Sequence, residues 1–218
     1  MWIGMEYLKD TVTYIFENSD RFLEALQVHL GLSFIALLIS MLICIPLGIV
    51  CAKKPKLSGL IMNVFNSLRV IPSLAIIVII LPIMGMGFYP ALIALIILAC
   101  PPITINTFLG FRGIDSSIIE AASGMGMDSK QILTKIEIPL ALPVIIAGCR
   151  TAAVEIIASA TLAAFIGGGG LGTFIVNGMG MYNIPLLLVG ALPVAFLAIC
   201  SEVCFAAVER LVTRYQRD

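Results

Sequence analysis

The sequence has 218 residues, of which 60% are hydrophobic and only 12% are charged, and its 13 basic and 13 acidic side chains leave a formal net charge of zero. Soluble domains usually carry about 25% charged residues, so this composition, with a mean hydropathy of +1.09, excludes an ordinary soluble domain. The balanced charge also gives no basis for a nucleic-acid partner. We therefore expect an integral membrane protein that crosses the bilayer several times.

Long runs without charged residues predict an all-α protein with about five transmembrane helices. A helix needs about 20 apolar residues to cross the roughly 30 Å hydrocarbon core. Turn-forming stretches at 53–59, 84–90 and 167–172 separate the runs. The expected spans, in chain order, are 25–51, 58–83, 88–111, 141–165 and 184–208.

The positions of lysine and arginine orient these spans. Cytoplasmic loops are enriched in positive charge, and with five spans the basic clusters at 53–56, 112–135 and 210–217 all fall on one side. The other side holds only Lys9 and Arg21. We expect the N-terminus outside the cell and the C-terminus in the cytoplasm.

The charge pattern also divides the chain into three parts. We expect an extracytoplasmic segment over 1–24, a membrane domain over 25–208 and a cytoplasmic tail over 209–218. Within the membrane domain, residues 112–140 form a polar cytoplasmic loop between the third and fourth spans.

This polar loop carries the signals of a short helix–turn–helix. Asp115 and its neighbouring serines can cap the start of a first helix, and Gly124 and Gly126 can end it. Asp128 or Ser129 can begin a second helix that runs towards Pro139. The small residues of the first helix would let a partner protein approach its backbone closely.

Within the loop, Glu120-Ala121-Ala122 is followed after three residues by Gly126, and nine residues later by Ile136-Glu137-Ile138-Pro139. This stretch resembles the EAA loop of the membrane subunits, or permeases, of bacterial ABC importers of the type I fold, whose pattern is E-A-A, three residues, G, nine residues and I-x-L-P. Ile138 stands where that family usually has leucine. The motif covers twenty residues and lies on the expected cytoplasmic side.

The resemblance implies a coupling helix that inserts into a cleft of a separate ATPase subunit. The implied ATPase-coupling residues are Ile119, Glu120, Ala121, Ala122, Gly124, Gly126, Ile136 and Pro139. The expected partners are two copies of an ABC ATPase, a second permease that is identical or a related paralogue, an extracellular substrate-binding protein and membrane lipid. The chain itself is expected to bind no cofactor and no metal and to catalyse no reaction, since ATP and magnesium belong to the ATPase.

Longer stretches of the chain resemble one branch of these importers. "LRVIPSLAIIVIILPIMGMGFYPALIALI" and "AGCRTAAVEIIASATLAAFIGGGGLGTFIVNGM" are similar to spans of osmoprotectant permeases. The resemblance implies transport of a quaternary amine such as glycine betaine, carnitine, choline or proline betaine across the bacterial plasma membrane. Permeases for methionine share the five-span size and the EAA pattern, and ergothioneine is a further alternative cargo.

Charged residues within the spans are costly and mark candidate functional positions. Arg69, Arg150 and Glu155 are candidates for the translocation path, where a carboxylate could attract a trimethylammonium group. The alternative is a structural role, either in cross-helix ion pairs such as Glu155 with Arg69 or by snorkelling of the arginines.

A run of four glycines follows the expected fourth span. Gly167, Gly168, Gly169 and Gly170 would allow non-helical backbone at membrane depth, either as part of an outer gate or as a plain turn. The run formally matches G-x-G-x-x-G, but a nucleotide-binding reading requires a preceding strand, and a membrane helix precedes it here.

Two other classes of protein fit the sequence less well. A membrane-embedded enzyme would need a nucleophile with a base or a metal cluster, and the chain has one histidine and neither an H-E-x-x-H nor a G-x-S-x-G motif. A secondary transporter usually shows an internal repeat and more spans.

Overall fold

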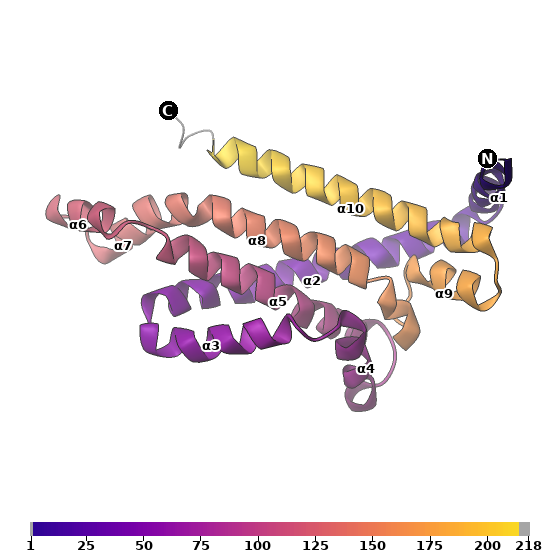
Figure 1. Ribbon diagram of the computed structural model, residues 1–218, viewed down its shortest axis with the longest axis horizontal. Coiled ribbons are helices and arrows are strands. Elements are labelled where there is room, and N and C mark those ends of the chain that lie inside the picture. The colour runs from indigo at the N-terminus through magenta and orange to yellow at the C-terminus, as the bar shows by residue number, and fades with distance from the viewer. Residues whose placement is uncertain (1, 214–218) are drawn as a thin grey trace.

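The computed structural model describes residues 2–213, and every regular element in this range is a helix (Figure 1), which confirms the predicted fold class. The last five residues of the expected cytoplasmic tail, 214–218, lie outside the described range. The α-helices are α1 (Trp2–Glu17), α2 (Ser19–Lys53), α3 (Pro55–Leu68), α4 (Ser73–Met84), α5 (Phe88–Arg112), α6 (Ser116–Gly124), α7 (Ser129–Ile132), α8 (Ile138–Ser159), α9 (Gly172–Gly180) and α10 (Ile184–Thr213).

Four helical runs within the described range are long and apolar enough to cross a membrane. They are α2, α5, the continuous run Ser129–Ser159 that contains α7 and α8, and α10. Helices α3 and α4 together make a fifth candidate, but they are bent by 99° relative to each other. The span expected over 58–83 is therefore not one continuous helix.

The bend between α3 and α4 has a local cause. Pro72 adopts an extended conformation with ψ 138° and precedes the first residue of α4. Proline has no backbone N–H, and it disfavours helical geometry in the residue before it, so the helix that begins at Pro55 ends before Pro72. The sequence therefore indicates where the helix breaks, although not how sharply it bends.

The core of the molecule lies where α2, α5 and α8 pack together. Buried apolar residues of all three helices form one cluster, which includes Leu32 from α2, Leu95 from α5 and Ile156 from α8. Glycines bring the backbones close, because a Cβ at Gly48 or at Gly148 would lie 2.6 Å from a side chain of α5. The membrane domain is thus held together by close helix packing through small residues.

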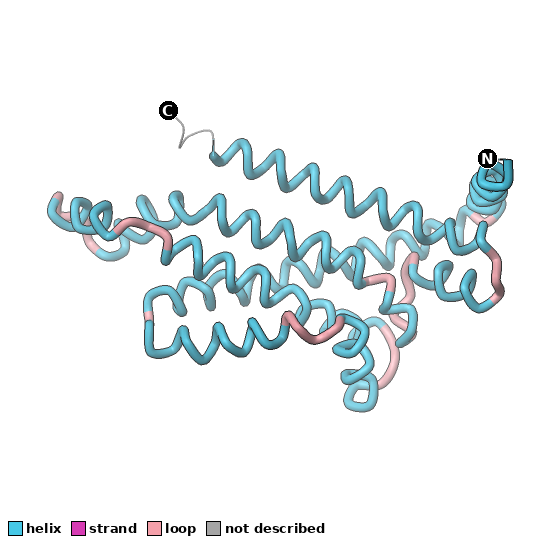
Figure 2. Tube along the Cα trace, in the orientation of Figure 1, coloured by secondary structure: helices cyan, strands magenta, loops and turns pink. Residues whose placement is uncertain are grey.

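The fourth span and the segment after it differ from the expected boundaries. The helix expected over 141–165 begins earlier and ends at Ser159, and a 3₁₀ turn, Leu162–Ile166, follows it. The glycine run then leads into α9, a short helix in the stretch between the expected fourth and fifth spans, where no helix was predicted. Figure 2 shows these loops and turns between the helices of the bundle.

The bundle has two different ends. Helices α6 and α7 lie at one end, and α1 and α9 lie at the opposite end (Figures 1 and 2). The described part of the segment expected over 1–24 consists of α1 and the first turns of α2, with Asn18 between them.

Candidate functional site

The polar loop between α5 and α8 forms the predicted helix–turn–helix. Asp115 caps α6, where its Oδ1 accepts a hydrogen bond of 2.9 Å from the backbone N–H of Ser117. This N–H, together with the Ser117 hydroxyl, lowers the pKa of the Asp115 carboxyl by stabilising its charged form. Gly126 then makes the turn with a φ of +85°, a conformation that favours glycine.

The second helix of the loop begins with a capping box. The Asp128 side chain accepts a hydrogen bond of 2.8 Å from the backbone N–H of Gln131, whose side-chain oxygen accepts one of 3.0 Å from the backbone N–H of Asp128. From Ser129 the chain continues through α7 and a π-helical turn, Leu133–Glu137, into α8 without a break. A displacement of the loop would therefore be transmitted directly along a membrane-crossing helix.

Most residues expected to contact the ATPase lie at the surface of this loop. Glu120, Ala121, Gly124 and Gly126 are exposed, and Ile119 is half-buried. Ala122 differs from them, because only 2% of its surface is exposed and it cannot present a free surface in this conformation. The contact with an ATPase stays a prediction for all of these residues.

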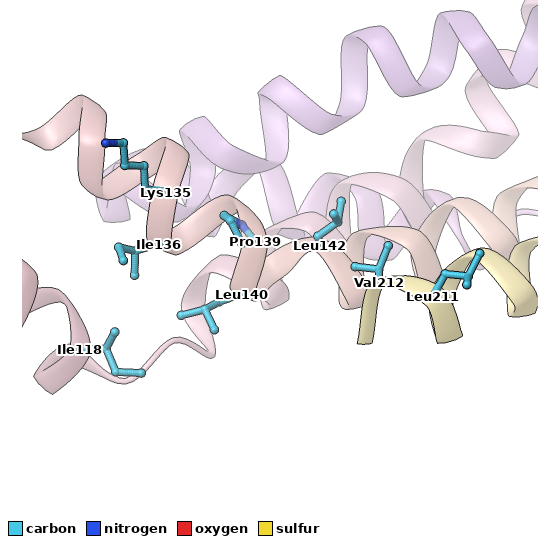
Figure 3. A pocket seen from close by; sticks show the side chains of 8 residues that line it. All are labelled: Ile118, Lys135, Ile136, Pro139, Leu140, Leu142, Leu211 and Val212. Carbon is cyan, nitrogen blue, oxygen red and sulfur yellow. The ribbon is translucent and has the colours of Figure 1, made fainter. Parts of the chain in front are cut away.

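An apolar hollow of about 810 Å³ lies beside the loop (Figure 3). Ile118 of α6 lines one side, and Leu211 and Val212 near the end of α10 line the other. The last two expected coupling residues, Ile136 and Pro139, contribute to the wall between them. Ile136 lies in the π-helical turn and Pro139 in the first turn of α8, so they shape the base of the loop rather than its tip.

An ion pair that the sequence did not predict joins the base of the loop to α2. Lys53, at the end of α2, donates hydrogen bonds to both carboxylate oxygens of Glu137, the motif residue between Ile136 and Ile138. The residue Glu137 is only 2% exposed, whereas the side chain of Lys53 is 47% exposed. The only sequence signal for this pair was a charged residue between two apolar ones in the motif.

The charged residues within the spans fall into two groups. Arg150 of α8 pairs with two carboxylates of α10, at 3.2 Å from Glu209 and in direct contact with Glu202. Arg69 and Glu155 form no ion pair with each other among the described residues, although they lie close enough to interact electrostatically. The three residues thus do not form one cluster, and their place in a translocation path stays a prediction.

The glycine run lies at the end of the bundle opposite the helix–turn–helix. Gly167, Gly169 and Gly170 have positive φ angles between 71° and 82°, so three of the four positions use a conformation that favours glycine. Just before the run, the Ile166 carbonyl accepts a hydrogen bond of 2.7 Å from the backbone N–H of Gly87, between α4 and α5. The run is therefore anchored to the connection between α4 and α5.

The chain is similar in sequence and in fold to known transport proteins. Residues 44–214 match the family described as "Binding-protein-dependent transport system inner membrane component". The chain is 43% identical over 202 residues to a carnitine transport permease protein, OpuCB, of Listeria monocytogenes, with 93% of each chain covered. It is 36% identical over 206 residues to a glycine betaine/carnitine/choline transport system permease protein, OpuCB, of Bacillus subtilis, with 94% and 95% covered. Its fold is similar to that of a chain in inward-facing structures of the MetNI methionine ABC transporter, with a TM-score of 0.81, 21% identity, and 88% and 96% of the two chains covered.

Proposed function

The chain belongs to the family of binding-protein-dependent transport system inner membrane components, and we propose that the cargo of its importer is a quaternary-amine osmoprotectant. It is the permease of an ABC importer and a multi-pass protein of the inner membrane. In this family ATP is hydrolysed by a separate ATPase subunit, and the cargo is captured by a binding protein.

The cargo assignment rests on similarity that covers almost the whole chain. The relative at 43% identity is named for carnitine, and the relative at 36% identity is named for glycine betaine, carnitine and choline. The likeness to the methionine importer is only 21% identical, so it supports the fold and does not favour methionine as the cargo. Carnitine, choline and glycine betaine share a trimethylammonium group, which defines the proposed class.

We further propose how the subunits are arranged. Two permeases, this chain with a second copy or a related chain, would enclose the path, and each would receive one ATPase on its cytoplasmic loop. The exposed surface of α6 supports this arrangement, since Glu120 and Ala121 are accessible there. The N-terminus and α9 would then lie on the outer side, next to the binding protein.

The proposed mechanism uses the rigid connection of the loop to the bundle. Closure of two ATPases on ATP would displace α6, and the continuous run Ser129–Ser159 would carry that displacement into the core. The ion pair between Lys53 and Glu137 ties the same run to α2, so α2 and α8 would move together. Such a rigid-body motion alternates access to a site between two permeases.

The coupling role of α6 can be tested with Ala121→Trp. The indole would make α6 too bulky for the cleft of the ATPase into which it is proposed to insert, so we expect ATP-driven uptake in proteoliposomes to fall at least about tenfold, with less ATPase in the purified complex. Val12→Trp is the matched control for the ATPase content, because Val12 is 51% exposed on α1 at the opposite end of the bundle. Normal uptake and normal ATPase content in Ala121→Trp would refute this role.

The cargo is tested in the same proteoliposomes with the binding protein present. We expect uptake of radiolabelled carnitine, choline or glycine betaine, and no uptake of methionine. Uptake of methionine alone would overturn the cargo assignment and leave the assignment as an ABC permease intact.

A further inference from the structure

A hollow of about 620 Å³ opens at the end of the bundle that lies opposite the coupling loop. Its walls come from α1, the start of α2 and α9, and the glycine run completes it through Gly169 and Gly170. None of the residues expected to contact the ATPase lines it. It therefore lies where a ligand would enter from the outer side in the proposed orientation.

Aromatic rings form part of the wall of this hollow. Tyr14 of α1 and Phe174 of α9 both line it, with their ring centroids 6.2 Å apart and their planes nearly perpendicular at 82°. Phe22 lies next to Phe174, at a centroid distance of 6.5 Å, and supports that ring. Aromatic rings attract quaternary ammonium groups through the negative charge of their faces, which makes this wall suitable for a trimethylammonium group.

The same hollow carries charges of both signs. Arg21 and Glu24 line it from adjacent turns of α2, and neither forms an ion pair with another described residue. A second hollow of about 300 Å³ shares Tyr14 with the first and adds the carboxylates of Asp10 and Glu17. Carboxylates thus outnumber the single arginine around the two hollows, and this balance favours a cation.

The floor of the hollow is the glycine run, which packs closely against α2. Gly169 and Gly170 approach α2 closely, since a Cβ at Gly169 would lie 3.2 Å from Val28 and one at Gly170 would lie 3.3 Å from His29. The same loop begins at Ile166, whose carbonyl is hydrogen-bonded to Gly87 between α4 and α5. A ligand against this floor would therefore contact the glycine run, which is joined by this hydrogen bond to the connection between α4 and α5.

We propose that this hollow is a receiving site for quaternary ammonium compounds released by the binding protein. The trimethylammonium group packs against Tyr14, whose ring is supported by the buried Phe174, and is attracted by Glu24. The carboxylate of a betaine or of carnitine pairs with Arg21, whereas choline has no carboxylate and does not use this residue. The inference rests on the proposed function, because the cargo class is taken from it.

Direct binding is measured on the permease–ATPase complex in lipid nanodiscs without the binding protein. Saturation-transfer NMR on the methyl protons of choline and of glycine betaine detects weak binding, and methionine serves as the control ligand. We expect both amines to bind the wild-type complex and methionine not to bind. Glu24→Gln should weaken binding of both amines about two- to fivefold, the range expected for an exposed charge interaction.

Arg21→Gln gives a second, independent readout. It should weaken binding of glycine betaine about two- to fivefold, and it should leave binding of choline unchanged or slightly tighter, because choline has no carboxylate and loses a nearby positive charge. The ratio of the two affinities is measured within one preparation, so it does not depend on how much protein is folded. Asp20→Asn is the matched control for both variants, because Asp20 is an exposed carboxylate at the start of α2 that does not line the hollow.

The outcomes separate this site from the proposed function. Uptake of the amines by the complete transporter, combined with no saturation transfer in the wild type or with wild-type affinities in both variants, would refute the site and leave the cargo intact. Absence of uptake for every quaternary amine would refute the cargo. Saturation transfer that changes as described would support the site in either case.

Discussion

At the scale of single residues, the ion pair between Lys53 and Glu137 is the most consequential contact of the coupling loop. Its two members are 84 positions apart in the chain, and they differ in environment, because the carboxylate is buried while the lysine reaches water. A buried charge without a partner is costly, whereas an exposed lysine without one is not. The two members of the pair should therefore respond differently to mutation.

We predict that Lys53→Met lowers the free energy of unfolding by about 2 kcal/mol, since it leaves the Glu137 carboxylate buried and unpaired. Glu137→Gln should cost less than about 1 kcal/mol, because Lys53 can remain hydrated. The double variant Lys53→Met/Glu137→Gln should recover part of the loss. Thermal unfolding in detergent measures all three, with Lys54→Met as the control at the neighbouring exposed lysine. Equal stability of Lys53→Met and Lys54→Met would contradict the argument.

Local signals allowed the sequence to predict much of the loop. The caps at Asp115 and Asp128 and the turn at Gly126 depend on residues within a few positions of each other, so their chemistry is readable from the sequence. The partners of Glu137 and Arg150 lie on other helices, 84 and 52 or more positions away. To predict such pairs, one must know how the helices are rotated relative to each other, and the hydropathy pattern does not give this rotation.

At the scale of helices, packing through glycine holds α2, α5 and α8 together. A Cβ at Gly148 of α8 would lie 2.6 Å from the Cβ of Asn106 and 2.8 Å from the carbonyl oxygen of Pro102, both on α5. The carbonyl belongs to the backbone and cannot rotate away. By contrast, a Cβ at Gly31 of α2 would meet nothing within 4 Å.

Gly148→Ala and Gly31→Ala thus form a matched pair with opposite expectations. Gly148→Ala should lower the free energy of unfolding by about 1–3 kcal/mol, because α8 must move away from α5. Gly31→Ala should be neutral or stabilise by up to about 1 kcal/mol, since alanine favours a helix over glycine. Thermal unfolding of the two purified variants compares them directly. Similar loss of stability in both would show that the close approach at Gly148 does not limit packing.

For the second and fourth spans, the sequence predicted the apolar segments correctly but not where their helices bend or end. Apolar composition extends through Pro72 and through Ala160, so it predicted spans over 58–83 and 141–165. The proline identified the break before α4, but the 99° bend depends on packing of α4 against α5. The end of α8 at Ser159 carries no proline, and only the structure reveals the 3₁₀ turn that follows.

At the scale of the whole molecule, the two ends of the bundle carry different chemistry. One end presents α6 and α7 with the EAA motif, and the other presents α1, α9 and the glycine run (Figure 1). The family and the fold were both predictable from the sequence, because a motif of twenty residues and the pattern of apolar runs carry them. The hollow between α1, α2 and α9 was not, since its walls come from segments about 150 residues apart.

The proposed orientation predicts the activity of reporter fusions. Green fluorescent protein fused after Asp218 should fluoresce, and alkaline phosphatase at the same position should be inactive, because the C-terminus is expected in the cytoplasm. Alkaline phosphatase fused after Leu171, behind the glycine run, should be active, because that run is expected on the outer side. The reverse pattern at both positions would invert the proposed topology and would place the coupling loop on the wrong side for an ATPase.

The elbow between α3 and α4 bears on how a cell handles a newly made subunit. Val70 is 81% exposed and Ile71 is 40% exposed at a place where the regular helical hydrogen-bonding pattern is interrupted. Irregular backbone is tolerated at membrane depth only when protein or a water-filled cavity surrounds it. We therefore expect an unassembled copy to present this elbow to membrane proteases and chaperones as a mark of an orphan subunit. In the proposed arrangement a second permease would cover the elbow, so degradation would remove copies that have not assembled.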